Sequence, residues 1–374
     1  MNKPRIALVS FSPLQVGGVE THLLQIMEGM GSDFEFLALG DVQEPFARQT
    51  EERGAQWLRL RPSGKLDLRT IARLENAFRQ NRIAIVHTHE TRAGLLGRVA
   101  AKASGRVSLH TVHTPAFFLT RSRVARWAYQ RVEKLLNEFA SEAVVFVSPS
   151  IRDLYRQLGL VSPRKSWLIP NGLEKDWFEA EAGSRAPGCV QLLYVGRLAP
   201  EKNLPTLMRA FTRTVAAHPN ARLRLVGDGP LREELGRMAG QEGLEGKVEF
   251  LGLLPREKAR ELMRGSDVFV LSSRFESMSY TLLEAMASGM ACIATEVGGN
   301  GDLLAQGAAG ILVPLGNEQA LEAALRSVVA SAPLRDQLGR AAREQASRYA
   351  VETMIASTRD LYLSLLAAHG LPRV

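Results

Sequence analysis

Apolar and polar positions along the chain follow two alternating patterns. Short continuous apolar runs, such as Arg5–Phe11 and Ile83–His87, are typical of strands that are buried on both faces of a parallel sheet. Between them lie stretches with an apolar residue every three or four positions, such as Leu68–Gln80, which predict amphipathic helices. This repeated alternation predicts an α/β fold with a parallel sheet covered by helices on both sides.

The same alternation begins again at Val190–Val195 and continues to Ile311–Val313. A chain of 374 residues exceeds what one hydrophobic core usually serves, so we expect two doubly wound, Rossmann-like domains. The join is expected between Ile169 and Pro187, where prolines and glycines interrupt the periodicity.

This join predicts an N-terminal domain of residues 1–172 and a C-terminal domain of residues 173–350. Residues 351–374 contain one more amphipathic helix, which we expect to cross back onto the N-terminal domain and bury its apolar stripe there. Ligands of open α/β sheets bind beyond the carboxyl ends of the strands. The two domains are therefore expected to face a central cleft that holds the site.

The composition argues against several classes of protein. With 45% hydrophobic and 23% charged residues, the chain is expected to be ordered. No apolar run approaches the ~20 residues that span a bilayer, and Pro4–Pro13 is too short for a signal peptide, so a cytoplasmic location is expected. Cys189 and Cys292 are far apart, which supports neither a disulfide framework nor a thiolate zinc site.

The net charge of +8 is concentrated in one segment. Arg92–Lys134 holds nine basic residues and one acid, Glu133, so it alone carries 9 − 1 = +8 and the rest of the chain sums to zero. A single basic stretch argues against a nucleic-acid channel. It is either a solvated helix face or, with the aromatic residues Phe117, Phe118, Trp127 and Tyr129, a docking surface for an anionic membrane or an acidic acceptor. The second interpretation predicts a peripheral protein on the inner face of the cytoplasmic membrane.

Two glutamates, Glu276 and Glu284, mark the strongest candidate site. In one continuous helix they would lie about 12 Å apart along the axis and about 80° apart around it, so they could not act on one atom. The composition instead predicts a loop at Glu276 and a helix that starts near Ser279. The amides of its first turn then suit a pyrophosphate, and the flanking carboxylates suit hydroxyl groups. The alternative is structural, with Thr281-x-x-Glu284 as a capping box.

Two further segments favour phosphate binding. Arg197 and Lys202 follow the first strand of the second domain after a glycine turn, where two cations can converge on a diphosphate and stabilise its departure. Gly17 and Gly18 allow the backbone of the first domain to approach a ligand closely. Surface loops with such residues are also common without any ligand.

Four histidines lie near the ends of two predicted strands. His87 and His89 follow one strand, and His110 and His113 follow the next. Neither pair has a third ligand at metal spacing, so no metal site is expected. His113 is the best placed to face the cleft, although a buried structural histidine would look the same in the sequence.

Six motifs occur in order along nearly the whole chain: Gly17-Gly-Val-Glu20, His113, Ile169-Pro-Asn-Gly172, Gly196-Arg-x4-Lys202, Gly227-Asp-Gly-Pro230 and Glu276-x7-Glu284. In this combination the chain resembles the GT4 family of retaining glycosyltransferases, which have the GT-B fold. The resemblance implies a nucleotide-sugar donor, a hydroxyl acceptor, retention of anomeric configuration, and neither a metal nor a cofactor.

The resemblance also implies roles for single residues. Arg197 and Lys202 would hold the donor diphosphate, together with the helix start and Gly17 or Gly18. The residues of the helix start are Met278, Ser279, Tyr280 and Thr281. Glu284 would bind the ribose, while Glu276 and His113 would contact the transferred sugar.

The chain departs from the family pattern at two places. Ser277, Met278 and Ser279 stand where the family has glycine, an aromatic residue, and glycine or proline. A loop that commonly reads Gly-Gly-x-x-Glu is Gly298-Gly-Asn-Gly-Asp302 here. Both departures concern contacts with the donor sugar, so the identity of the sugar and of its base stays open. The acceptor suggested by the basic segment is a lipid-linked or envelope saccharide.

Two other enzyme classes share parts of this plan. A nicotinamide-dependent dehydrogenase would also have Rossmann-like domains, and Asp41 ends the second strand where a ribose-binding acid is expected, but the G-x-G-x-x-G fingerprint is missing. A sugar-nucleotide epimerase of the same fold would act on the donor without an acceptor. A non-catalytic interaction protein would not need cations and paired glutamates around a helix start.

Overall fold

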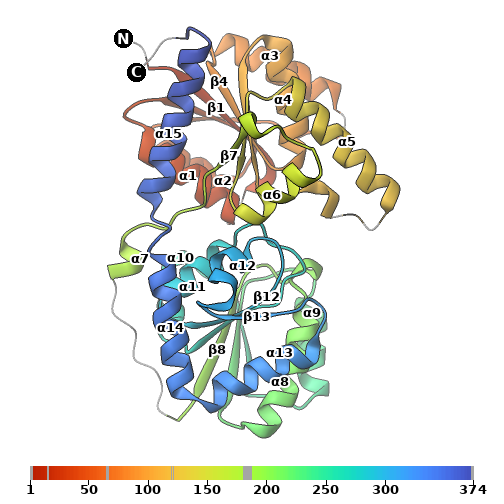
Figure 1. Cartoon of the computed structure of the whole chain (residues 1–374), viewed down its shortest axis with the longest axis vertical. Helices are drawn as coiled ribbons and strands as arrows, with labels where there is room; N and C mark the ends of the chain where they lie inside the picture. The colour runs from red at the N-terminus through yellow and green to blue at the C-terminus, as the bar shows by residue number, and fades with distance from the viewer. Residues whose placement is uncertain are drawn as a thin grey trace. The chain divides into compact units, whose positions relative to one another are not determined.

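The computed structural model describes residues 3–14, 17–64, 67–118, 120, 122–179 and 188–371. The chain forms two compact units, the first made of residues 1–172 and 351–374 and the second of residues 173–350 (Figure 1). The stretch expected to join the domains is described up to residue 179, and the remainder as far as Pro187 lies outside the described residues.

The first unit is built on a sheet in which every pair of neighbouring strands is parallel. Its strands are β1 (Arg5–Leu14), β2 (Glu35–Val42), β3 (Gln56–Arg59), β4 (Ile85–His89), β5 (Val107–Val112), β6 (Ala143–Phe146) and β7 (Ser166–Leu168). Their order is β3-β2-β1-β4-β5-β6-β7. The direction of winding reverses between β1 and β4, so the carboxyl ends of these strands are where such a sheet binds ligands.

Helices cover both faces of this sheet (Figure 1). They are α1 (Gly18–Met30), α2 (Glu44–Glu52), α3 (Leu68–Gln80), α4 (Thr91–Ser104), α5 (Arg123–Phe139) and α6 (Pro149–Gln157), with short 3-10 turns at Ala116–Phe118 and Pro163–Lys165. Alternate residues of β1 enter opposite cores. Ile6 and Leu8 pack with α1, whereas Ala7 and Val9 pack with α3 and α4. A continuous apolar run in the sequence therefore supplies both layers.

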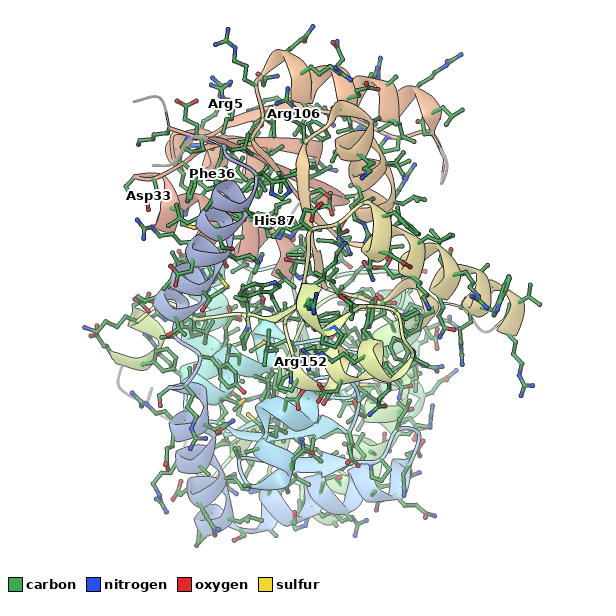
Figure 2. All side chains as sticks on the ribbon, turned by 45° about the horizontal axis from the view of Figure 1, so that its top comes forward. Arg5, Asp33, Phe36, His87, Arg106 and Arg152 are labelled. Carbon is green, nitrogen blue, oxygen red and sulfur yellow. The ribbon has the colours of Figure 1, made fainter. Side chains whose placement is uncertain are left out.

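The last helix, α15 (Val351–Ala368), belongs to the first unit and packs beside α1. The Tyr362 hydroxyl lies 2.7 Å from His87 Nδ1 in the interior, and Arg359 donates to Asp33 over 2.7 Å in a partly buried position. Figure 2 labels His87 and Asp33 of these two pairs. The two helices approach so closely that a Cβ atom at Gly29 would lie 2.8 Å from the Ile355 side chain. Burial of one helical stripe and two polar anchors hold this distant segment on the sheet.

The second unit repeats the architecture. Its strands are β8 (Val190–Val195), β9 (Ala221–Val226), β10 (Val248–Gly252), β11 (Val268–Leu271), β12 (Ala291–Thr295) and β13 (Ile311–Val313), all parallel in the order β10-β9-β8-β11-β12-β13. Its helices are α7 (Asp176–Glu179), α8 (Leu204–Ala217), α9 (Arg232–Gln241), α10 (Arg256–Arg264), α11 (Tyr280–Ala287), α12 (Asn300–Leu303), α13 (Glu318–Ala330) and α14 (Ala332–Ala346), with 3-10 turns at Pro200–Lys202 and Ala305–Gly307. The prediction of two Rossmann-like α/β domains is confirmed.

Two expectations drawn from composition concern membranes and thiols. Among the described residues, no helix is both long enough and apolar enough to cross a bilayer. Cys292 is buried in β12 and Cys189 is half-buried, and neither forms a disulfide.

Candidate functional site

Two glycine turns of the second unit meet at the carboxyl ends of β8 and β9. Gly196 has a φ of 154° and Gly227 a φ of 126°. A Cβ atom at Gly227 would lie 2.0 Å from the carbonyl oxygen of Gly196, so the two backbones are in direct contact. The Leu198 amide donates to the Asp228 carbonyl over 2.8 Å, which fixes the turn that carries Arg197. Only glycine meets both the conformation and the contact at 227.

The two cations after β8 lie in different surroundings. Arg197 is exposed, and its guanidinium has no ion pair with any residue that the structure describes. Lys202 ends the 3-10 turn, and its Nζ donates to Glu276 Oε1 over 2.5 Å. The Lys202 side chain is 22% exposed and that of Glu276 is 12% exposed. A contact 74 positions apart in the chain thus brings together two residues that the sequence suggested separately.

Glu276 is held by three segments. Its Oε1 also accepts a hydrogen bond from Ser273 Oγ at 2.7 Å, and its backbone carbonyl accepts one from the Gly299 amide at 3.0 Å. At Gly298, φ is 50° and a Cβ atom would lie 1.7 Å from the Glu276 carbonyl oxygen. The loop that begins at Gly298 is one of the two departures from the family pattern. It packs directly on Glu276, which immediately precedes the other departure at Ser277. Ser273 was not predicted, because nothing in the local pattern distinguishes it from other serines.

Helix α11 starts one residue after Ser279. Ser279 Oγ accepts from the Leu282 amide at 3.3 Å and lies 3.1 Å from Thr281 Oγ1. The alternative of a Thr281-x-x-Glu284 capping box is wrong, because Ser279 is the cap and Glu284 lies too far into the helix to reach back to it. A loop at Glu276 and a helix start between the two glutamates are observed as expected.

Glu284 is buried and is approached by one cation that sequence reasoning missed. Arg256 Nη2 lies 3.4 Å from Glu284 Oε1, and its guanidinium also binds both carboxylate oxygens of Glu174 at 3.0 and 2.8 Å. Burial raises the pKa of Glu284 to about 7, and the nearby Arg256 lowers it by less. Near neutral pH the carboxyl can therefore either donate or accept a hydrogen bond. Arg256 opens α10, where the sequence shows an ordinary charged helix face.

The remaining residues of this segment are buried. Met278, Ser279 and Tyr280 are each at most 8% exposed, and Thr281 is half-buried. The hydroxyl of Ser277 is buried and has no hydrogen-bond partner among the described residues. A buried hydroxyl without a partner is uncommon, and it points to a ligand atom or a water at this position.

In the first unit, Gly17 and Gly18 start α1. The Gly17 carbonyl accepts from the Thr21 amide at 3.0 Å and from its hydroxyl at 3.1 Å. A Cβ atom at Gly17 would lie 2.7 Å from Glu20 Oε2, so a side chain there would displace that carboxylate. Burial raises the pKa of Glu20 to about 7. Gly18 is exposed.

The histidines fall into two groups. His87 and His110 are buried and hydrogen-bonded inside the sheet, His87 to Tyr362 and Thr111 at 2.7 Å each and His110 to Thr88. His113 lies just after β5 and is half-buried, and its Nε2 is 3.1 Å from His89 Nδ1. A third imidazole, His22 of α1, lies beside this pair. The premise that no third ligand is near was wrong, because the third histidine comes from a helix 67 positions earlier in the chain than His89.

The basic segment is only partly a surface. Arg98 is completely buried, where it donates to Glu133 at 3.0 Å and to Asn137 at 2.6 Å, and Phe117 is buried as well. Counting all nine cations of Arg92–Lys134 toward a docking face was therefore wrong. The exposed cations and aromatic residues lie mainly on α5, which also exposes Val124, Trp127, Val132, Leu135 and Phe139.

Asp41 was the acid that a dinucleotide site would need. Its carboxylate accepts from Arg61 Nε at 2.5 Å and lies 3.5 Å from Arg59 Nε. The Asp41 carboxylate is thus paired with Arg59 and Arg61, which lie in and just after the edge strand β3.

Comparison with known proteins agrees with this architecture. The model of glycosyl transferases group 1 matches residues 178–345, and that of glycosyltransferase family 4 matches residues 16–177. The chain is 27% identical over 317 residues to the UDP-Gal:alpha-D-GlcNAc-diphosphoundecaprenol alpha-1,3-galactosyltransferase of Escherichia coli, covering 80% of each chain. It is 28% identical over 225 residues to the glycogen synthase of Mycobacterium tuberculosis, covering 60% of this chain but only 54% of that enzyme.

Solved structures share the fold at lower identity. HepE from Anabaena, in complex with UDP and glucose, superposes with a TM-score of 0.82 at 20% identity, covering 96% of this chain and all of that one. Sucrose-phosphate synthase from Thermosynechococcus elongatus gives 0.82 at 24% identity, covering 98% and 100%. The fold is therefore GT-B. The chain is a glycosyltransferase that uses nucleotide sugars as donors. The chain belongs to the GT4 family.

Proposed function

We propose that the chain is a retaining, metal-independent hexosyltransferase, which moves a sugar from a nucleoside diphosphate to a hydroxyl of a saccharide acceptor. The observation that carries the proposal is the Lys202–Glu276 contact at the carboxyl end of the second sheet, with exposed Arg197 in the same segment after β8. Two cations and a carboxylate on rigid turns suit a ligand with a diphosphate and sugar hydroxyls. The E. coli relative, named for UDP-galactose, and the UDP complex of HepE support UDP as the carrier.

The charge balance suggests how the donor enters. Without a donor, Glu276 neutralises Lys202. A diphosphate would bring negative charge to Lys202 and Arg197, and would leave Glu276 to accept hydrogen bonds from the sugar. Both hydrogen bonds of its carboxylate to described residues use Oε1, which leaves Oε2 for a sugar hydroxyl. Arg197, Lys202 and the positive end of α11 supply the charge that a metal ion supplies in other transferases.

The residues around α11 suggest where the phosphates, the ribose and the sugar of the donor would bind. Met278, Ser279, Tyr280 and Thr281 form the helix start, which lies between the two glutamates and would face the phosphates. Glu284 would bind the ribose, since a carboxyl with a pKa of about 7 can exchange hydrogen bonds with a pair of hydroxyls. The unpartnered hydroxyl of Ser277 would meet the sugar, where this chain differs from its family.

Retention of configuration is part of the proposal. The Glu276 carboxylate is anchored by Lys202 and Ser273, which suits a hydrogen-bond acceptor better than a nucleophile that must reach the anomeric carbon. The acceptor would then attack on the face that the diphosphate leaves. Gly17 or Gly18 would approach the distal phosphate, and His113 would contact the sugar from the first unit.

Helix α5 supports a lipid-linked acceptor on an anionic membrane. Val124, Trp127, Arg131, Leu135 and Phe139 recur every three or four residues and form one exposed stripe, in which Arg131 stacks on Trp127 at 5.4 Å. An exposed stripe of this kind with flanking cations is typical of a helix that lies in a membrane interface. The name of the E. coli relative includes an undecaprenol-linked acceptor, which supports the same assignment.

The proposal is tested by donor binding. UDP-, GDP- and ADP-sugars are screened for thermal stabilisation, where a ligand at 100 times its Kd adds about 2.7 kcal/mol. We expect a UDP-sugar to stabilise the wild type and Lys258→Met, which removes an exposed lysine of the same unit paired with Glu261 at 2.8 Å, but not Lys202→Met. No response to any nucleotide sugar would contradict the proposal. Conversion of the donor sugar without an acceptor would indicate an epimerase, and the anomeric proton coupling of the product reports retention.

A further inference from the structure

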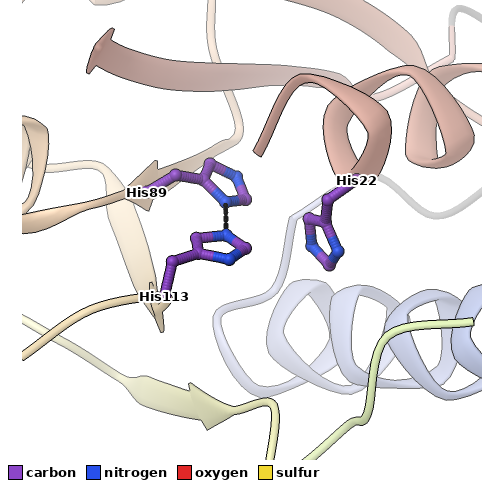
Figure 3. A group of neighbouring side chains, drawn as sticks. All are labelled: His22, His89 and His113. Atoms are coloured by element: carbon purple, nitrogen blue, oxygen red, sulfur yellow. Dashed lines mark hydrogen bonds between the residues drawn. The ribbon is translucent and has the colours of Figure 1, made fainter. Parts of the chain in front are cut away.

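Three imidazoles converge in the first unit, on three different elements (Figure 3). His22 lies on α1, His89 ends β4, and His113 follows β5. Their ring centroids are 5.0 Å apart for His22 and His113, 5.3 Å for His89 and His113, and 5.5 Å for His22 and His89. One ring nitrogen of each lies within 4.8 Å of the others. The ring centroids thus form a nearly equilateral triangle.

The parallel sheet explains why these residues meet. Strands β1, β4 and β5 are consecutive neighbours, and α1 begins where β1 has ended. The carboxyl ends of parallel strands share one edge, so the first turns of α1 and the ends of β4 and β5 lie together. The convergence is therefore built on rigid elements and not on a single loop.

Two ring nitrogens of these imidazoles lack a hydrogen-bond partner in the part of the chain that the structure describes. His22 Nδ1 and His89 Nε2 are buried and have no hydrogen-bond partner among the described residues, and both residues are at most 2% exposed. The remaining contact within the triangle is the 3.1 Å hydrogen bond between His89 Nδ1 and His113 Nε2. Buried polar atoms without partners call for an explanation, and a ligand ion is one.

The spacing agrees with that of a metal site. A zinc ion about 2.05 Å from three imidazole nitrogens at tetrahedral angles separates those nitrogens by about 3.3 Å and the ring centroids by about 5.2 Å. The observed centroid distances are 5.0 to 5.5 Å, and the His89–His113 nitrogens are 3.1 Å apart. An ion held by His89 Nδ1 and His113 Nε2 would replace the hydrogen bond between these two atoms, and one nitrogen of His22 lies within 4.8 Å of a nitrogen of each.

The neighbours suit an outer shell. His87 lies with its ring centroid 4.1 Å from that of His89, but both of its nitrogens are occupied by Tyr362 and Thr111, so it is not a ligand. Asn171 interacts with the His22 side chain. Partners of this kind fix the orientation of ligating histidines. His113 is half-buried, so a fourth position on its side is open to water.

We propose that His22, His89 and His113 bind one late first-row divalent ion, of which Zn2+ is the representative, and that the bound ion inhibits sugar transfer. Three neutral imidazoles select Zn2+, Co2+, Ni2+ or Cu2+ over Mg2+, which prefers oxygen ligands. The inhibitory half rests on the proposed function, because it assigns His113 to the sugar and an ion on that imidazole prevents the contact. The binding half does not depend on the reaction.

Binding is measured on the whole chain after treatment with a chelator. We expect one Zn2+ per chain by titration against a chromophoric chelator, and visible absorption from bound Co2+ of the kind that a four-coordinate site gives. His22→Ala should weaken Zn2+ binding more than about tenfold, since loss of even an outer-shell partner has an effect of that size. His218→Ala, in the second unit, should bind as the wild type does. Circular dichroism checks that each variant is folded, and His22→Gln is the replacement if His22→Ala is not.

Inhibition is then measured against the zinc-free rate of each variant. We expect stoichiometric Zn2+ to suppress transfer by the wild type and by His218→Ala, a chelator to restore it, and His22→Ala to resist. Zn2+ binding that is equal in the wild type and His22→Ala would overturn the site. Tight binding that leaves turnover unchanged would overturn the inhibitory role and, with it, the contact of His113 with the sugar. Donor binding to the second unit, measured separately, tells this outcome from a failure of the proposed function.

Discussion

The two units place their clusters of chemical groups at the same kind of position, but they treat charge differently. In the second unit, Lys202 and Glu276 form an ion pair beside β8 at 2.5 Å. In the first unit, the described residues place no acid within the cluster of imidazoles beside β4 and β5, and burial lowers the pKa of these imidazoles. The parallel sheet supplies the place in both cases, and the presence or absence of a partner decides the charge.

The comparison also explains the intermediate case. Glu284 has one cation at 3.4 Å that is shared with Glu174, and its pKa rises to about 7. Arg98 in the first unit is completely buried, and Glu133 and Asn137 accept hydrogen bonds from it. Glu284 and Arg98 are thus both buried beside a group of opposite charge, Arg256 and Glu133 respectively.

The largest effect is expected at the ion pair of the second unit. Glu276→Gln keeps the shape but removes the charge, and we expect turnover to fall roughly 10³-fold, about 4 kcal/mol, because the sugar contact and the hold on Lys202 are lost together. Steady-state kinetics with a saturating donor checks this. Because both side chains are largely buried, a loss of stability of about 1–2 kcal/mol should accompany it.

Glu261→Gln is the control, since it neutralises an exposed partner of Lys258 in the same unit. Its turnover and its melting temperature should match those of the wild type. Equal turnover in Glu276→Gln and Glu261→Gln would mean that the Lys202–Glu276 ion pair has no role in transfer. The assignment of the site in the second unit would then be wrong.

The next effect sharpens the comparison within the first unit. Arg98→Met should lower the free energy of unfolding by about 3 kcal/mol, because Glu133 would be left partly buried without its cation. Arg131→Met, on the exposed face of the same segment, should change it by less than about 0.5 kcal/mol. Denaturant titration of both variants measures the difference. Similar stabilities would mean that Arg98 is not held by its charge.

A smaller effect depends on pH. The folded pKa of Glu284 is raised to about 7, so its stabilising contribution is complete below the unfolded value of about 4.3 and is lost as the pH rises through 7. Glu284→Gln mimics the protonated form. Relative to the wild type, it should gain about 2 kcal/mol of stability between pH 5 and pH 8.

Glu257→Gln, which changes an exposed glutamate of α10, should show no such dependence. Denaturant titrations at several pH values follow both variants. A Glu284→Gln difference that is flat with pH would mean that Arg256 keeps the carboxyl ionised.

The smallest effect concerns the exposed stripe of α5. Trp127→Ser should weaken binding to anionic vesicles about tenfold, because Trp127 is 59% exposed and its indole can enter the interface. Leu253→Ser, an equally apolar exposed position of the second unit, should leave binding unchanged. Vesicle sedimentation measures both. Binding should also fall as salt increases, since screening shortens the reach of exposed cations, and binding that ignores salt would contradict the role of the cations.

Much of the fold followed from the sequence because it depends on local patterns. Continuous apolar runs gave the strands, three-to-four spacing gave the helices, and Gly289 marked the end of α11. The helix start at Tyr280 also followed from the residues around it. That Ser279 and not Thr281 caps the helix depends on backbone angles that the amino-acid sequence does not specify.

The chain by itself determined the class of fold, the family and which loops carry charge. Tertiary structure alone decided what those charges do, because the partners of each group lie far away in the sequence. Lys202 binds Glu276, which lies 74 positions later in the chain, and Arg256 contacts Glu284 from another helix. Arg98 belongs to the basic segment but is buried in the core. His22 joins His89 and His113 only because three neighbouring strands end at one edge of a sheet.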